Sequence, residues 1–151
     1  MKLFRKTVHY LSVIAIIALA ACGPAAVPDP NAAKPSRAGG IGQAVSLKGD
    51  IARGKDLFQN KCSECHGDEG KGGIVNGGSE DGSIPALNPI DPTLTNADPK
   101  VFAANLDLFI EHGSTPKGEP SRVMLGYGDL KILQPQQIAD VIAYIIFLNT
   151  K

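Results

Sequence analysis

The sequence predicts an all-α domain toward its carboxyl end, and three observations indicate that class. Three segments repeat apolar residues at spacings of three and four, as a helix with one buried face does. No stretch of the sequence alternates apolar and polar residues with the period of two that is typical of a half-buried strand. The chain between the helical segments is rich in glycine and proline, which indicates irregular loops.

The first expected helix covers residues 49–61. Ile51, Leu57 and Phe58 recur at roughly helical spacing, and Asp50 is a residue type that is favoured at the N-cap. We expect this helix to run directly into Cys62.

Two further helices are expected over residues 98–112 and 134–149. The former has Asp98 as its cap, Pro99 at its first position and Gly113 just past its end. The latter has Pro135 near its start. Their apolar faces contain Val101, Phe102, Leu106, Phe109 and Ile110 in the former, and Ile138, Val141, Ile142, Ile145 and Leu148 in the latter.

Long loops separate these helices. Residues 67–83 contain seven glycines among seventeen residues, and residues 84–96 contain three prolines. Three short helices without a tryptophan give a small core for about a hundred residues. Domains of this kind usually need a covalent link between segments or a large buried cofactor.

Residues 1–21 resemble a bacterial lipoprotein signal peptide. Lys2, Arg5 and Lys6 precede an apolar run over residues 11–20, which is shorter than the roughly 20 apolar residues of a membrane-spanning helix. Small residues then lead to Cys22, where lipoproteins of this pattern carry a diacylglyceryl group on the thiol. We therefore expect export and a lipid anchor at Cys22. An ordinary signal peptide that happens to end near a cysteine is the alternative.

Residues 22–46 are expected to form a tether. They are rich in proline, alanine and glycine and contain almost nothing large and apolar, so they bury too little surface to offset their ordering entropy. Such a segment is expected to be an extended, semi-rigid leash, although it could also pack along a partner subunit. Residues 47–151 then form one small domain.

The charge of the chain is unevenly distributed. Residues 47–151 contain ten Lys and Arg but fourteen Asp and Glu, which gives a net charge of 10 − 14 = −4. A nucleic-acid-binding domain needs a basic surface, so this balance argues against that class. An acidic surface is compatible with docking against a basic patch on a redox partner.

Cys62, Cys65 and His66 form a Cys-x-x-Cys-His motif at the end of the first expected helix. A disulfide would not need the histidine, and a thioredoxin-like site would need a βαβ context that this sequence lacks. A structural zinc site would need four ligands. The motif is the attachment pattern of haem c, in which two thiols bond to the porphyrin vinyl groups and the adjacent imidazole binds the iron.

A second axial ligand must then come from another segment. Apart from Met1, the sequence contains one methionine, Met124, in the loop between the second and third expected helices. A thioether opposite a histidine is a pairing used by electron-transfer haem proteins. His112 is the competing candidate, but a histidine at a helix carboxyl end also interacts with the helix dipole. We expect Met124 to be the ligand; the alternative is that it serves only in packing.

From about Gly49 to Leu148 the chain resembles the class I, mono-haem cytochromes c. The motifs that support the resemblance are GKDLFQNKCSECHG at one end and IADVIAYIIFL at the other. In that family a glycine and an aromatic residue on the first helix cross an aromatic residue on the last. The resemblance implies these roles for Gly54, Phe58 and Tyr144, and a cytochrome c-like fold with three main helices around one covalent haem.

The family also places a proline carbonyl against the axial histidine. Pro85 and Pro92 both fit the local Pro-x-Leu pattern, and we favour Pro85. The candidate walls of the haem pocket, each of which would equally suit an ordinary core, are Leu87, Leu106, Phe109, Ile110, Tyr127 and Ile142. The chain departs from the family at Met124, which is followed by leucine where the usual residue is proline.

These expectations describe an electron carrier without a small-molecule substrate, at the outer face of the cytoplasmic membrane or in the periplasm. Its partners would be redox proteins, either reached by a swinging tether or present in one respiratory or photosynthetic complex. The chain combines a single haem motif, a lipoprotein signal pattern that ends at Cys22 and a tether. In this combination it is similar to the mono-haem cytochrome subunit of alternative complex III, a quinol-oxidising assembly. The alternatives are a haem enzyme such as a peroxidase, or a ligand sensor, in which Met124 leaves the iron.

Overall fold

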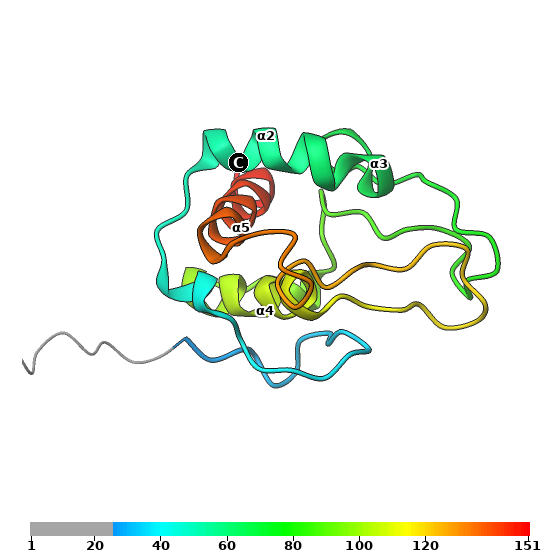
Figure 1. Ribbon diagram of the computed structural model, residues 1–151, viewed down its shortest axis with the longest axis horizontal. Coiled ribbons are helices and arrows are strands. Elements are labelled where there is room, and N and C mark those ends of the chain that lie inside the picture. Colours follow the sequence, from blue (N-terminus) through cyan, green and yellow to red (C-terminus); the bar gives the residue numbers. More distant parts are fainter. Residues whose placement is uncertain (1–25) are drawn as a thin grey trace, which may run out of the picture.

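The computed structural model describes residues 26–151, so the expected signal peptide and Cys22 lie outside the described residues (Figure 1). The described chain contains the helices α2 (Ile51–Lys61), α3 (Ser63–His66), α4 (Pro99–His112) and α5 (Pro135–Asn149). Within residues 26–151, β-structure is restricted to isolated bridges. The all-α class is confirmed, and the three long helices begin within two residues of their expected starts.

Each long helix begins at a residue that satisfies free backbone N–H groups. The Asp50 side chain accepts a hydrogen bond from the Arg53 N–H, and the Asp98 side chain accepts one from the Lys100 N–H. Gln134 and Gln137 form a reciprocal capping box at the start of α5. Pro99 and Pro135 occupy the first helical positions, where no N–H is needed.

Helices α2 and α5 cross in close contact, and Gly54 makes that crossing possible. A Cβ atom at Gly54 would overlap the backbone carbonyl oxygen of Asp140 on α5. One turn further along, the rings of Phe58 and Tyr144 pack edge to face with their centroids 5.5 Å apart. Both rings are buried, so the two helices are fixed by one small residue and one aromatic pair.

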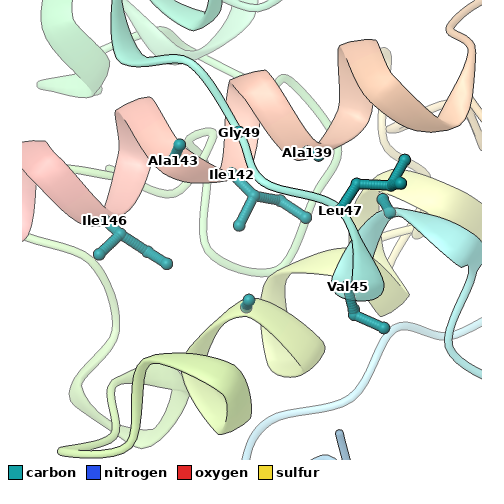
Figure 2. A pocket seen from close by; sticks show the side chains of 9 residues that line it. Val45, Leu47, Gly49, Ala139, Ile142, Ala143 and Ile146 are labelled. Atoms are coloured by element: carbon teal, nitrogen blue, oxygen red, sulfur yellow. The ribbon is translucent and has the colours of Figure 1, made fainter. Parts of the chain in front are cut away.

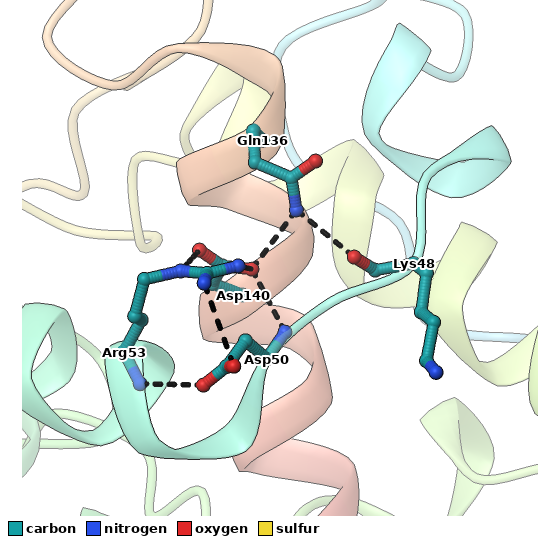
Figure 3. Close-up of polar contacts among 5 residues, drawn as sticks. All are labelled: Lys48, Asp50, Arg53, Gln136 and Asp140. Carbon is teal, nitrogen blue, oxygen red and sulfur yellow. Dashed lines mark hydrogen bonds and ion pairs between the residues drawn. The ribbon is translucent and has the colours of Figure 1, made fainter.

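A polar network fixes the start of α2 against α5 (Figure 3). Asp140, 2% exposed, accepts hydrogen bonds from the Asp50 N–H at 2.8 Å and the Arg53 Nε at 2.9 Å. The Gln136 side chain donates to Asp140 and to the Lys48 carbonyl oxygen. Burial opposes ionisation of Asp140, but the Arg53 guanidinium and the Asp50 N–H outweigh it and lower the pKa of this carboxyl.

Helix α4 packs on α5 and supplies much of the core. The buried apolar cluster comprises Ala32, Ala44, Phe58, Ile90, Leu94, Phe102, Leu106, Ile110, Leu133, Ile138, Ala139, Val141, Ile142, Tyr144, Ile145 and Leu148.

No helix within residues 26–151 combines the length and the apolar character that crossing a bilayer requires.

Residues 26–46 do not form the expected free leash. We call this segment the strap because it lies along the domain beside α4, and it ends in the 3₁₀ helix η1 (Gln43–Ser46) (Figure 1). Ala32 and Ala44 of the strap are buried in the core cluster. Its backbone is satisfied by polar side chains of α4, which a count of apolar residues does not take into account.

A small apolar hollow of about 140 Å³ lies where the end of the strap meets α4 and α5 (Figure 2). Val45 and Leu47 line it from one side, and Ile142 and Ile146 of α5 line it from the other. Its lining includes none of the cysteines or histidines, so the hollow is separate from the candidate site described below.

The glycine-rich loop over residues 67–83 is held by one buried side chain. Asn76, 1% exposed, donates from its side chain to the Arg122 carbonyl oxygen and accepts from the Arg122 N–H at 2.9 Å. An isolated bridge joins Ser79 to Gly118. The loop is therefore tied to the segment that precedes Met124.

Candidate functional site

The Cys62–Cys65–His66 motif occupies a single turn after α2. Cys62 caps the carboxyl end of α2, and its N–H donates to the Phe58 carbonyl oxygen. The Cys62 carbonyl oxygen then accepts from the N–H groups of Cys65 and His66, at 3.1 and 2.9 Å. Both thiols are free and partly buried. The hydrogen bonding thus brings two sulfur atoms and one imidazole together on a rigid turn.

The imidazole of His66 is oriented by a backbone carbonyl. Its Nδ1 lies 3.0 Å from the Pro85 oxygen, and because a carbonyl only accepts, Nδ1 must carry the proton. The lone pair is therefore on Nε2, the nitrogen left to bind a metal. The expected contact is made by Pro85; Pro92 instead begins the 3₁₀ helix η3 (Pro92–Leu94).

His66 also has the protonation state that a metal ligand needs. Burial lowers the pKa of its imidazole, and the bond to Pro85 offsets only part of that effect. The ring is therefore neutral at neutral pH, and a neutral imidazole can donate its Nε2 lone pair.

The loop that follows His66 positions the Pro85 carbonyl. The Gly70 carbonyl oxygen accepts from the N–H groups of Leu87 and Asn88, at 2.7 and 3.0 Å. Gly70 has a φ of 74°, and a Cβ atom there would lie 3.0 Å from the Leu87 Cβ. A glycine at this position therefore allows the segment that contains Pro85 to pass close to the motif turn.

The environment of Cys62 does not favour a thiolate. Burial, with a smaller contribution from Cys65, raises the pKa of the Cys62 thiol to about 12. Redox-active and zinc-binding cysteines act as thiolates, so Cys62 is not tuned for either role. Moreover, no three His, Cys, Asp or Glu side chains within residues 26–151 are grouped so that they could hold a metal ion.

Met124 lies in a loop that is fixed to the end of α4. Its N–H and carbonyl oxygen both pair with Ser114, at 2.9 and 3.0 Å, and its side chain packs against the core cluster. Gly113, with a φ of 73°, ends α4 so closely that a Cβ atom would overlap the Met124 carbonyl oxygen. The position of Met124 therefore depends on α4 and on the Asn76 contacts described above.

Tyr127 connects the Met124 loop to the motif turn. Its hydroxyl donates to the Lys61 carbonyl oxygen at 2.8 Å, next to Cys62, and its N–H donates to Ile110 of α4. The carboxyl end of α2 has free carbonyl groups, and this hydroxyl satisfies one of them. Leu87 and Tyr127 both pack against the core cluster as partly buried residues.

His112 is engaged elsewhere. Its Nε2 lies 2.7 Å from the Gly40 carbonyl oxygen, and its Nδ1 lies 2.9 Å from the Asp129 carboxylate. Both ring nitrogens are thus occupied by acceptors, so His112 offers no free lone pair to a metal. The imidazole holds the strap, which is a more specific role than the helix-dipole interaction expected for it.

Sequence reasoning missed the side chains that support the site from a distance. Asn149 at the end of α5 donates to the Leu87 carbonyl oxygen and accepts from the Ile90 N–H, at 2.8 and 3.0 Å. Asn76 holds the Met124 side of the site in a comparable way. An asparagine in a glycine-rich loop or at a helix end resembles an ordinary turn residue, so the sequence gives no signal for either role.

The residues present fit a covalently attached haem. The turn offers two free thiols for thioether bonds and one oriented, neutral imidazole beside them. Leu87 and Tyr127 supply partly apolar walls, and Met124 offers a soft sulfur donor on a fixed loop. The expected pairing of Gly54, Phe58 and Tyr144 is present in the helix crossing that adjoins this turn.

Comparison with protein families gave one match. A family model described as cytochrome c matches residues 51–148, which is more than half of the chain. No curated protein and no solved structure matched.

Proposed function

The chain belongs to the cytochrome c family, and on that premise we propose that it is a lipid-anchored electron carrier whose iron is bound by His66 and Met124. Members of this family bind haem c covalently, and Cys62 and Cys65 fit the attachment motif. The observation that carries the proposal is the bond between His66 Nδ1 and the Pro85 carbonyl oxygen, because it leaves Nε2 for iron.

When bound, haem c supplies an iron that gains and loses one electron without making or breaking bonds to a substrate. The residues of the chain restrict what else can happen. Pro85 fixes the orientation of the His66 ring, and the partly buried Leu87 and Tyr127 limit the access of water. Such an arrangement suits electron transfer by contact with another protein.

Met124 is the proposed second axial ligand. Its backbone is paired to Ser114, and the loop around it is tied to α2 through Tyr127 and to the glycine-rich loop through Asn76. A donor on a fixed loop exchanges less readily than one on a free loop, which favours an iron with both axial positions filled. His112, the competitor, has both ring nitrogens occupied.

The proposed location is the outer face of the cytoplasmic membrane or the periplasm. Domains of this family are usually exported, and the basic and apolar residues before Cys22 support export and lipidation. We further propose a place in an electron-transport complex, such as a quinol-oxidising assembly of the alternative complex III type. The net charge of −4 on residues 47–151 suits a partner with a basic docking patch.

The absorption spectrum of the oxidised protein tests the ligand assignment. We expect a weak band at the red edge that arises from charge transfer between sulfur and iron, and we expect Met124→Ala to abolish it. Leu125→Ala is the matched control, because Leu125 is 43% exposed and adjacent to Met124. If Met124→Ala retains the band, or if the unmodified protein lacks it, Met124 is not the ligand.

A further inference from the structure

The strap is bound to α4 through polar side chains that are themselves buried. The Asp29 N–H donates to the Asn105 side chain at 2.8 Å, and the Gly42 N–H donates to the Asp107 carboxylate. Asn105 and Asp107 are at most 1% exposed, so these bonds are shielded from water. His112 adds its bond to the Gly40 carbonyl oxygen. The strap is therefore part of the folded domain.

A docked strap leaves little free chain before it. Cys22 is four positions before Ala26, and an extended chain covers at most about 3.6 Å per residue. The chain between these residues therefore spans at most about 14 Å. This step rests on the proposed function: if Cys22 carries the lipid, the docked strap begins within that distance of the bilayer surface.

The charge of the strap suits an anionic lipid surface. Lys34 and Arg37 are exposed, whereas the one acidic residue, Asp29, accepts hydrogen bonds from Asn31 and Asn96. Residues 26–46 thus have a net charge of 2 − 1 = +1, against −4 for residues 47–151. Anionic headgroups attract such a basic segment and repel the acidic remainder of the domain. Val27, 66% exposed, adds an apolar side chain near the expected anchor.

The haem motif lies on the other side of the molecule. Figure 1 shows α2 and α3 along one side and the strap along the opposite side, with α4 and α5 between them. We propose that the strap is the membrane-facing side of the domain, that it binds an anionic phospholipid surface, and that the Cys62–Cys65–His66 turn points away from the bilayer. The motif turn is then available to partner proteins, and the domain cannot swing freely.

Spin labels on the two sides of the lipidated, haem-loaded protein test this orientation. Ala38→Cys labels the strap and Asp68→Cys labels the loop after α3; both positions are exposed. The native cysteines are occupied by haem and lipid, so only the introduced thiol reacts. The vesicles contain phosphatidylcholine, phosphatidylglycerol and a nickel-chelating lipid, so nickel ions at the bilayer surface speed the relaxation of nearby spin labels. We expect this enhancement to be several-fold stronger for the label at position 38 than for the label at position 68.

A pair of charge variants tests the role of the basic residues. Lys34→Gln with Arg37→Gln is expected to lower the enhancement at position 38, whereas Lys71→Gln with Lys117→Gln removes equal charge from exposed loops and should leave it unchanged. Equal effects of the two double variants would overturn the electrostatic part of the proposal.

Flotation of the same vesicles distinguishes failure of the proposed lipid anchor from failure of the proposed orientation. If the protein does not float, the lipid anchor is absent and the orientation is overturned with it. If the protein floats but positions 38 and 68 show equal enhancement, the anchor stands and the orientation alone is wrong. In that case the strap is free to contact a partner protein instead.

Discussion

At the scale of single residues, the Pro85 carbonyl has the most direct influence on the proposed iron ligand. It accepts the proton of His66 Nδ1, which fixes the tautomer and gives the imidazole partial anionic character. A more basic imidazole stabilises the oxidised iron more than the reduced iron. The reduction potential of the protein should therefore depend on how this carbonyl is held.

Pro85→Ala is expected to raise the reduction potential. The fixed φ of proline, about −65°, helps to aim the carbonyl, and its loss should lengthen the bond to His66. A redox titration of the haem-loaded protein measures the change. Pro92→Ala is the matched control, because Pro92 begins η3 and its carbonyl accepts from Thr95. Equal potentials in the two variants would show that Pro85 does not tune the iron.

At the scale of elements, the crossing of α2 and α5 is the structural centre of the domain. Gly54, the Phe58–Tyr144 ring pair and the Asp140 network all lie along it. The motif turn directly follows α2, so any displacement of α2 from α5 also moves Cys62, Cys65 and His66. Stability and haem geometry are therefore linked through this crossing.

Gly54→Ala should destabilise the protein by about 1 to 3 kcal/mol or more, the usual cost of overpacking. The added Cβ atom would overlap the Asp140 carbonyl oxygen, and a backbone atom cannot rotate away. Denaturant unfolding of the haem-loaded protein measures the loss. Gly77→Ala is the control, since its Cβ would lie 3.9 Å from the nearest side chain. Similar stability of both variants would contradict the close crossing.

The elements differ in how far the sequence determines them. The three long helices were predictable because cap residues and apolar spacing agree at Asp50, Asp98 and Pro135. The Pro85 contact was predictable only through resemblance to a family, since nothing local distinguishes Pro85 from Pro92. The positions of Asn76 and Asn149 could not be predicted, because their partners lie 46 and 62 residues away in the sequence.

At the scale of the whole molecule, the docked strap changes how the protein is expected to work. Its composition predicts a leash, because few of its residues are large and apolar. The structure instead satisfies its backbone with Asn105, Asp107 and His112, three polar residues on a largely buried helix. Polar residues on the buried face of such a helix indicate a docked segment, because buried polar groups need hydrogen-bond partners.

Docking of the strap should weaken as the pH rises. Burial opposes the charge on His112, but the bonds to Gly40 and Asp129 outweigh it and raise the pKa of the imidazole above its usual value. Glu111 adds to the acidic surroundings. Because the pKa of His112 is raised in the docked state, the protonated imidazole stabilises docking of the strap. This stabilisation is complete below the ordinary histidine pKa of roughly 6.5 and is lost as the pH rises through the raised pKa.

Hydrogen exchange of the strap amides measures this effect. Protection factors for residues 39–42 should fall as pH rises through the raised pKa of His112, while those of α5 should stay constant. Asp107 also faces the strap, and burial raises the pKa of its carboxyl, so a variant is needed to assign the pH step to His112. His112→Gln removes the titrating group and should abolish the pH step. A step that persists in His112→Gln would show that another group controls docking.

The most direct test of the central claim is exposure of the reduced, haem-loaded protein to carbon monoxide. If His66 and Met124 fill both axial positions, the absorption spectrum should not change, and the protein is an electron carrier. If the spectrum shifts to that of a carbon monoxide adduct, one axial position is open or easily vacated. That result would contradict the account and favour a haem enzyme or a ligand sensor.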